Sequence, residues 1–269
     1  GIAASSTVPV GGLAVGTSNQ VNGGSATAMA FGLGNATTGG FGVALGVGNQ
    51  SSATSAIALG TANIASSNTA IAMGRQNTAS GQTSIALGNV STANQTNAIA
   101  IGHSAQATGA GAIAMGGGLN RASTSLDTTA AAASGTDAVA IGTNSNSNGT
   151  ASVSLGSGAR ATGEGSITIG QNAGATPNAS NANNIAIGAG NTAIGQGAGA
   201  SVTGSTNQAF GQGAGSTIAG NNNVTLGIQS GSGVTGNANT SFGSGNTGGQ
   251  VVGNANLALG TGAGVNVTG

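Results

Sequence analysis

The sequence predicts an all-β fold in which short parallel strands stack into a solenoid with coils of about 14 to 16 residues. Three observations lead to this prediction. A motif of apolar residue, small residue, apolar residue and glycine recurs along the chain, 55 of the 269 residues are glycine, and only six residues carry a formal charge. Globular domains usually contain about 25% charged residues, so this composition indicates a repetitive structural or adhesive chain.

The spacing of the motif defines the coil. Its closing glycines are Gly16, Gly32, Gly46, Gly60, Gly74, Gly88, Gly102, Gly116, Gly142, Gly156, Gly170 and Gly188. Between Gly32 and Gly116 a 14-residue step occurs six times in succession, and the remaining steps are equal to it or longer. A second small residue usually follows halfway to the next glycine, which predicts two short strands and two corners in each coil. Glycine suits such corners because it reaches positive φ without steric cost.

After Gly188 the glycines continue at steps that mostly alternate between seven and nine. This spacing predicts wider, 16-residue coils, with strands that end at Phe210, Leu226, Phe242 and Leu259. We therefore expect residues 1–269 to form a single solenoid. Mainly 14-residue coils would occupy 1–188, and 16-residue coils would occupy 189–269.

The alternation within each motif assigns side chains to two faces. In Ile71, Ala72 and Met73 the two large side chains share one face and alanine lies on the other. We expect the large side chains to point into the coil and the alanines to point outward. Such a core is thin, so a single chain should be marginally stable, and association would stabilise it. The predicted subunit interface is the alanine column Ala58, Ala72, Ala86, Ala100 and Ala114.

Composition excludes several functional classes. The net charge is zero and no lysine is present, which argues against nucleic-acid binding and against a Walker-type phosphate loop. There is no cysteine and only one histidine, so we expect no thiolate metal site, no catalytic residues and no cofactor. No window approaches the roughly 20 apolar residues of a membrane span, so we expect no membrane contact by this segment.

One interval interrupts the repeat. A 26-residue step separates Gly116 from Gly142 in place of the usual 14-residue step, which predicts a 12-residue insertion within 117–135. Insertions in solenoids form loops that often bind ligands. Arg121, Leu126 and Asp127 are therefore the candidate ligand-binding residues. A loop that is merely tolerated would explain the insertion equally well.

The repeat resembles a known family. Residues 97–109 read NAIAIGHSAQATG, which is similar to the YadA-type head repeat of trimeric autotransporter adhesins. The resemblance runs from about Leu13 to Gly188, with a looser variant to Gly269. It implies a left-handed parallel β-roll, a homotrimer, and display on the bacterial cell surface through an outer-membrane anchor. It also implies non-enzymatic adhesion to host matrix proteins, cells or surfaces.

Two alternative functions remain open. A trimeric phage or secreted fibre could use the same roll, and the segments that flank this chain in its parent protein would distinguish it from an adhesin. A self-assembling or ice-binding solenoid is the other alternative. Ice binding would favour a regular outward ladder of threonine, but only Thr168 and Thr225 occupy the middle position of the strand motif.

Overall fold

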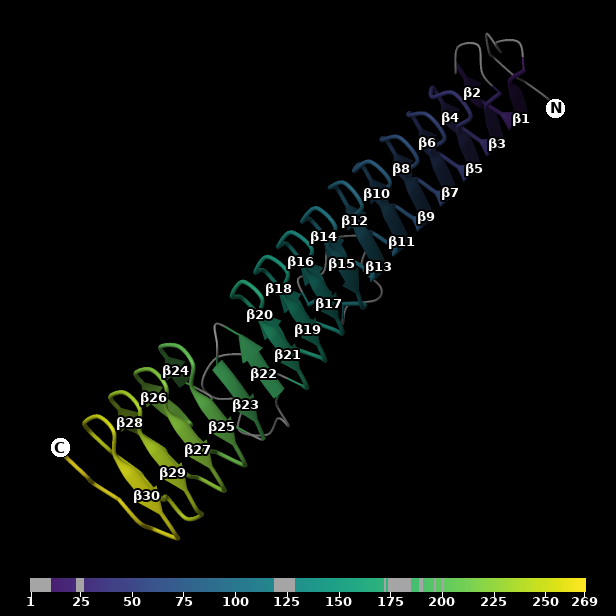
Figure 1. Ribbon diagram of the computed structural model, residues 1–269. Helices are drawn as coiled ribbons and strands as arrows, with labels where there is room; N and C mark the ends of the chain where they lie inside the picture. Colours follow the sequence, from purple (N-terminus) through teal and green to yellow (C-terminus); the bar gives the residue numbers. More distant parts are fainter. Residues whose placement is uncertain are drawn as a thin grey trace. The chain divides into compact units, whose positions relative to one another are not determined.

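The computed structural model describes residues 11–22, 27–118, 129–171, 173, 185–188, 191–195, 197–199 and 201–269. All regular elements in these residues are β-strands, and none is a helix. Contacts divide the chain into two units, residues 1–145 and 146–269. Each unit is built from coils whose strands stack on the next coil, which confirms the predicted all-β solenoid (Figure 1).

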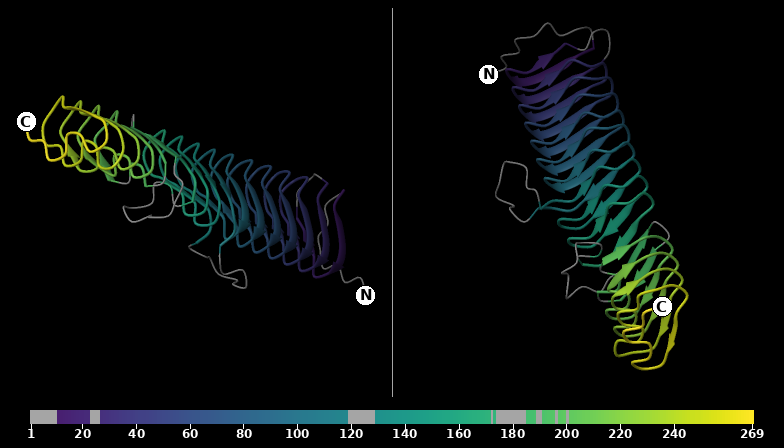
Figure 2. Two further views of the ribbon diagram at one scale, coloured as in Figure 1. Left: turned by 90° about the horizontal axis from the view of Figure 1, so that it is seen from below. Right: turned by 90° about the vertical axis from the view of Figure 1, so that its left-hand side faces the viewer.

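In the first unit the apolar motif forms one long strand in each coil. These strands are β1 (Leu13–Thr17), β3 (Met29–Leu33), β5 (Val43–Val47), β7 (Ile57–Thr61), β9 (Ile71–Arg75), β11 (Ile85–Asn89), β13 (Ile99–His103), β15 (Ile113–Met115) and β17 (Val139–Ile141). Neighbouring long strands are parallel and in register, so Ile71 lies between Ile57 and Ile85. The right-hand view of Figure 2 shows these strands in one stacked array.

The second half of each coil supplies a two-residue strand. These strands are β2 (Gln20–Val21), β4 (Ala36–Thr37), β6 (Gln50–Ser51), β8 (Ile64–Ala65), β10 (Thr78–Ala79), β12 (Thr92–Ala93), β14 (Gln106–Ala107) and β16 (Ala132–Ala133). They pair in parallel from coil to coil, as β8, β10 and β12 do. The predicted plan of two strands and two corners is therefore confirmed in this unit.

The motif glycine is required where the coils touch. Gly74 has φ +120°, and a Cβ on it would lie 2.0 Å from the carbonyl oxygen of Gly88 in the next coil. A side chain there would separate coils that lie at the usual strand spacing of about 4.8 Å. The 14-residue period of glycine thus allows successive coils to stack directly.

The core of the first unit consists of small side chains. Alanines from both strands of each coil are completely buried, among them Ala72 on β9 and Ala79 on β10. Ile71 and Met73, the residues on either side of Ala72, point outward and are only partly buried. The predicted orientation is therefore wrong. The reason is width, because the interior of a 14-residue coil holds alanine, serine or, at Thr37, threonine, and leaves no room for isoleucine or methionine.

A ladder of buried asparagines runs through five successive coils of the same unit. Asn19, Asn35, Asn49, Asn63 and Asn77 are fully buried, and each follows the motif glycine by three residues. The Asn63 side-chain amide donates to Asn49 Oδ1 at 2.9 Å, to the Leu59 carbonyl at 2.9 Å and to the Gly74 carbonyl at 2.7 Å. These bonds satisfy the buried amide and tie each coil to both of its neighbours.

The second unit begins with 14-residue coils and continues with wider ones. Its strands are β18 (Asn146–Ser147), β19 (Val153–Leu155), β20 (Arg160–Ala161), β21 (Ile167–Ile169), β22 (Ile185–Gly188), β23 (Asn191–Ile194), β24 (Ser201–Thr203), β25 (Gln208–Phe210), β26 (Thr217–Ala219), β27 (Val224–Leu226), β28 (Val234–Thr235), β29 (Thr240–Phe242) and β30 (Leu257–Leu259). Gln208 pairs with Val224, and Val224 with Thr240, which confirms the 16-residue step.

One strand of this unit departs from the parallel arrangement. Ile185–Gly188 forms β22 as a strand, but β22 runs antiparallel to both β21 and β23. The expectation that this copy of the motif stacks in parallel is wrong. Only two residues separate β22 from β23. Such a short link can join antiparallel strands, whereas parallel strands need a crossover of about a dozen residues or more.

The wider coils have a different core. Ile218, Val234 and Val251 are almost fully buried and pack with the partly buried Val202 and Val267. These side chains belong to the second half of the coil, at or near β24, β26 and β28. On the long-strand side, residues such as Ala209 and Thr225 are buried. Two additional residues per coil therefore make room for branched side chains.

Candidate functional site

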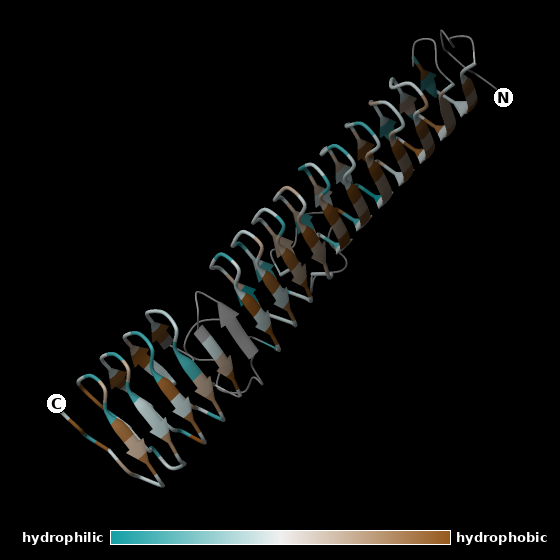
Figure 3. Ribbon diagram, viewed as in Figure 1, coloured by the Kyte–Doolittle hydropathy of each residue, from teal (hydrophilic) through white to brown (hydrophobic). Residues whose placement is uncertain are grey.

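The outward side of the long strands in the first unit carries two columns of large apolar side chains, which we call the apolar face. The first column is Val43, Ile57, Ile71, Ile85, Ile99, Ile113 and Val139, and the second is Leu45, Leu59, Met73, Leu87, Ile101, Met115 and Ile141. All of these side chains are half-buried or exposed. Figure 3 shows the long strands largely in brown and many of the corners in white or teal. Contiguous apolar surface of this kind marks an interaction site.

The backbone explains why the apolar face is regular. Each long strand pairs residue for residue with the next, so equivalent side chains repeat at the strand spacing. Period-2 alternation places the first and third residues of the motif on one side of the sheet and the alanine on the other. Because alanine fills the interior, the larger residues are directed to the outside.

The alanines predicted to form the subunit interface lie inside the coil, on the opposite side of the long strands from the apolar face. Ala58, Ala72, Ala86, Ala100 and Ala114 are all 0% exposed within a single chain. Their side chains are enclosed by their own coil and offer no surface to another chain. The residues on either side of each alanine, such as Ile71 and Met73, are the ones that reach the surface.

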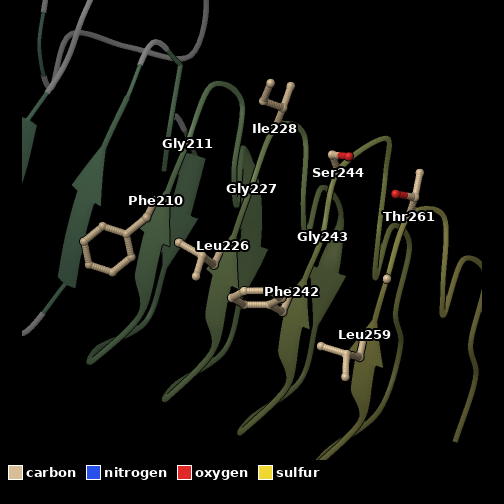
Figure 4. A pocket seen from close by; sticks show the side chains of 11 residues that line it. Phe210, Gly211, Leu226, Gly227, Ile228, Phe242, Gly243, Ser244, Leu259 and Thr261 are labelled. Carbon is tan, nitrogen blue, oxygen red and sulfur yellow. The ribbon is translucent and has the colours of Figure 1, made fainter.

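The second unit presents a related apolar surface in the form of a groove. An open groove of about 800 Å³ is lined chiefly by Phe210, Leu226, Phe242 and Leu259, which are the third residues of β25, β27, β29 and β30. Ile228 and the polar residues Ser244 and Thr261 border it (Figure 4). Phe242 is 50% exposed. The groove shows that the apolar character of the long-strand side is retained in the wider coils.

Sequence reasoning did not identify this groove, although it located the strands. The available signal was the third residue of each motif, which is large in both units. Assigning those residues to the interior concealed the surface that they form.

Charged groups are sparse in the described structure. Arg75 ends β9, Asp137 lies at a corner before β17, Arg160 begins β20 and Glu164 lies at a corner before β21. Among the described residues, no group of three or more His, Cys, Asp or Glu side chains could hold a metal ion. The same residues include no helix that is long and apolar enough to cross a membrane. Arg75, Asp137, Arg160 and Glu164 are exposed, and the rest of the described surface offers apolar side chains and neutral hydrogen-bonding groups.

The candidate ligand-binding residues Arg121, Leu126 and Asp127 lie outside the described residues. The coils on either side of the insertion stack on each other directly. Strand β15 pairs with β17, and β14 pairs with β16, in the same register as in uninterrupted coils. The insertion falls in the sequence between β15 and β16, and both strands keep the pairing seen in uninterrupted coils.

The comparisons with known proteins agree with this architecture. The model of the YadA head domain repeat, a unit of two copies, matches residues 38–63, 65–91, 93–118, 133–159 and 147–173. No curated protein matches the chain. The matched segments contain the whole apolar face, the long strands that carry it and their corner glycines. With this repeat recurring from residue 38 to residue 173, the chain belongs to the YadA-like head domains of trimeric autotransporter adhesins.

Proposed function

We propose that this chain is the trimeric, non-enzymatic head of a bacterial surface adhesin, and that the apolar face is its subunit interface. The observation that carries the proposal is the double column of outward large apolar side chains along the long strands. Trimer formation is a general property of YadA head domains. The two columns provide the surface on which three copies would associate.

The energetic argument rests on what an isolated chain exposes. Burial of apolar surface stabilises an assembly by roughly 25 cal/mol per Å². Half-exposed side chains recur at every coil, for example Leu45 at 41% and Leu87 at 36% exposure. Net charge is zero, so electrostatic repulsion does not oppose association. A parallel trimer that covers the apolar face would add buried apolar surface to the small alanine core of each chain.

The family also supports an extracellular location and an adhesive role. YadA-like domains are displayed on the bacterial surface, and the family is generally non-enzymatic. We propose a ligand in host matrix or on another surface. The insertion with Arg121, Leu126 and Asp127 is a candidate contact region, because solenoid insertions often bind ligands. No nucleic acid or cofactor enters this proposal.

Light scattering of the purified chain tests the interface. We expect a mass three times the 24.4 kDa of one chain. The double variant Ile71→Asp with Ile85→Asp should give folded monomers, because the carboxylates are on the apolar face and an isolated chain solvates them. The single variant Ala72→Asp should instead lose its circular dichroism signal, because its carboxylate is forced into a closed interior at a cost of several kcal/mol.

The matched control is Gln76→Asp with Gln82→Asp, which adds the same charge at two exposed corner residues. It should remain folded and trimeric. A wild-type chain that is a stable monomer at micromolar concentration would contradict the proposal. So would a trimer that tolerates aspartate at both Ile71 and Ile85.

A further inference from the structure

A single aromatic side chain interrupts a polar corner of the first unit. Phe41 lies in the turn between β4 and β5, is 59% exposed, and has φ +58°. Bulky side chains rarely adopt this left-handed conformation because it is sterically strained. In the next four coils the same position is occupied by Ser55, Thr69, Thr83 and Asn97, all with φ between 55° and 59°. Phe41 therefore adds strain and exposed apolar surface without filling the core.

The surroundings of Phe41 are uncharged and rich in hydrogen-bonding groups. Successive corners stack through backbone bonds, such as that from Ser55 N to the Gly40 carbonyl at 2.8 Å. The residue that begins each corner is polar and exposed in five successive coils, and these residues are Thr38, Ser52, Ser66, Ser80 and Asn94. A second exposed polar column contains Thr54, Asn68, Gln82 and Thr96. The aromatic ring thus lies at one end of a strip of hydroxyl and amide groups.

The residues that surround Phe41 in the sequence carry no charge, so a partner bound at this corner cannot form an ion pair with them. Lys, Arg, Asp, Glu and His are all absent from the sequence before Arg75. A partner bound here must therefore combine an apolar surface for the ring with neutral hydrogen-bonding groups for the strip. Aromatic residues commonly provide the central contact of such surfaces, since they contribute a large apolar area at low conformational-entropy cost.

We propose that the corner around Phe41 is a binding site for a neutral carbohydrate chain. A pyranose ring presents an apolar C–H face that can stack on the Phe41 ring, and its hydroxyl groups both donate and accept hydrogen bonds. The Ser, Thr and Asn side chains of the following corners offer both kinds of partner. Because these side chains repeat at the coil spacing, an extended oligosaccharide could contact several coils in succession.

This inference rests on the proposed adhesive function for its biological role, but it concerns a different surface from the apolar face. Calorimetric titration of the full chain with four neutral hexasaccharides, namely cellohexaose, maltohexaose, chitohexaose and β-1,4-mannohexaose, tests it. Hexagalacturonate is the anionic comparison. We expect at least one neutral sugar to bind with a Kd below about 1 mM and Phe41→Ser to weaken that binding at least tenfold.

Serine occupies the equivalent turn position as Ser55, so Phe41→Ser should retain the fold and the oligomeric state. The variant Phe41→Tyr keeps an aromatic ring and should still bind. Introducing Thr69→Phe into the Phe41→Ser variant restores a ring two coils along and should recover binding. The proposal is overturned if none of the neutral sugars binds, if only hexagalacturonate binds, or if Phe41→Ser binds as tightly as the wild-type chain. Light scattering on the same samples shows separately whether the trimer proposal fails.

Discussion

The two units place side chains of different sizes inside coils of different lengths. In the first unit, 14-residue coils bury alanine from both strands, as Ala72 and Ala79 show. In the second unit, 16-residue coils bury Ile218 and Val234 on one side and small residues on the other. The difference shows that coil length, rather than hydrophobicity alone, decides which side chains enter the core.

A coil within the first unit supports the same conclusion. Leu13 and Met29 are paired across a 16-residue step, and the short strand of that coil buries Val21 completely. The equivalent positions in the following 14-residue coils are Thr37, Ser51 and Ala65. The wider coil thus buries the branched apolar Val21. In the 14-residue coils the side chain at this position is first polar, at Thr37, and then smaller, at Ser51 and Ala65.

Asparagine ladders are common to both units. Asn207, Asn223 and Asn239 form a buried ladder in the second unit, as Asn49, Asn63 and Asn77 do in the first. The second unit also has an exposed ladder of Asn221, Asn237 and Asn254. Buried asparagine ladders therefore occur with both kinds of core, although the ladder of the first unit ends at Asn77, beyond which Ser91 and then Ala105 take the equivalent position.

Truncating the largest core side chain of the 16-residue coils should cause the largest loss of stability. We expect Ile218→Ala to destabilise the second unit by about 2–5 kcal/mol, because it leaves a cavity among Val202, Val234 and Val251. Chemical denaturation followed by circular dichroism measures the change. The control Ile64→Ala removes the same atoms from a partly exposed position of a 14-residue coil, and it should cost about 1 kcal/mol or less. Equal losses at the two sites would contradict the role of coil length.

Removing a side chain of the buried asparagine ladder should cause the second-largest loss of stability. Asn63→Ala removes the contacts of the two amide N–H groups with Asn49 Oδ1 and the Leu59 and Gly74 carbonyls, and it leaves Asn77 N and Nδ2 without the Asn63 Oδ1 acceptor. Unsatisfied buried groups cost about 1–3 kcal/mol, so we expect a loss near 3 kcal/mol. Thermal melting would measure it. Asn237→Ala in the exposed ladder is the control and should cost less than about 1 kcal/mol, since water can replace the lost partners. A larger loss at Asn237 would reverse our ranking of the two ladders.

A smaller effect is expected from enlarging a side chain in the narrow coil. Ala79→Val should destabilise the first unit by about 1–3 kcal/mol, because overpacking forces the two strands apart. The outward neighbour provides the control, since Thr78→Val adds no volume to the core and should stay within about 0.5 kcal/mol. Urea denaturation of both variants measures the difference. If valine at residue 79 were stabilising, the 14-residue coil would have spare interior volume.

The smallest effect should come from removing the insertion. Deleting residues 118–129 restores a 14-residue spacing between Gly116 and the next motif glycine. Because β15 and β17 already pair directly, we expect the free energy of unfolding to change by less than about 0.5 kcal/mol. Loss of adhesion with an unchanged melting curve would support a binding role for Arg121, Leu126 and Asp127. A large loss of stability would show that the insertion supports the solenoid.

The sequence by itself determined the strands, the corners and the coil lengths. Glycine spacing was informative because only glycine permits the close approach seen at Gly74, and each closing glycine marks one coil. Alternation also indicated correctly that Ile71 and Met73 share a face opposite Ala72. The groove at Phe210 and Phe242 could have been located by the same reasoning, because both residues occupy the third position of the motif.

The tertiary structure alone decided which face is inside. Alternation is symmetric between the two faces, and the usual preference for large apolar residues in the core selected the wrong one. The distance between the two strands of a coil excludes Ile71 and admits Ala72, and that distance arises only when both halves of the coil are closed against each other. The direction of β22 was likewise undetermined by its motif. It was decided by its short link to β23 and by pairing with strands on both sides.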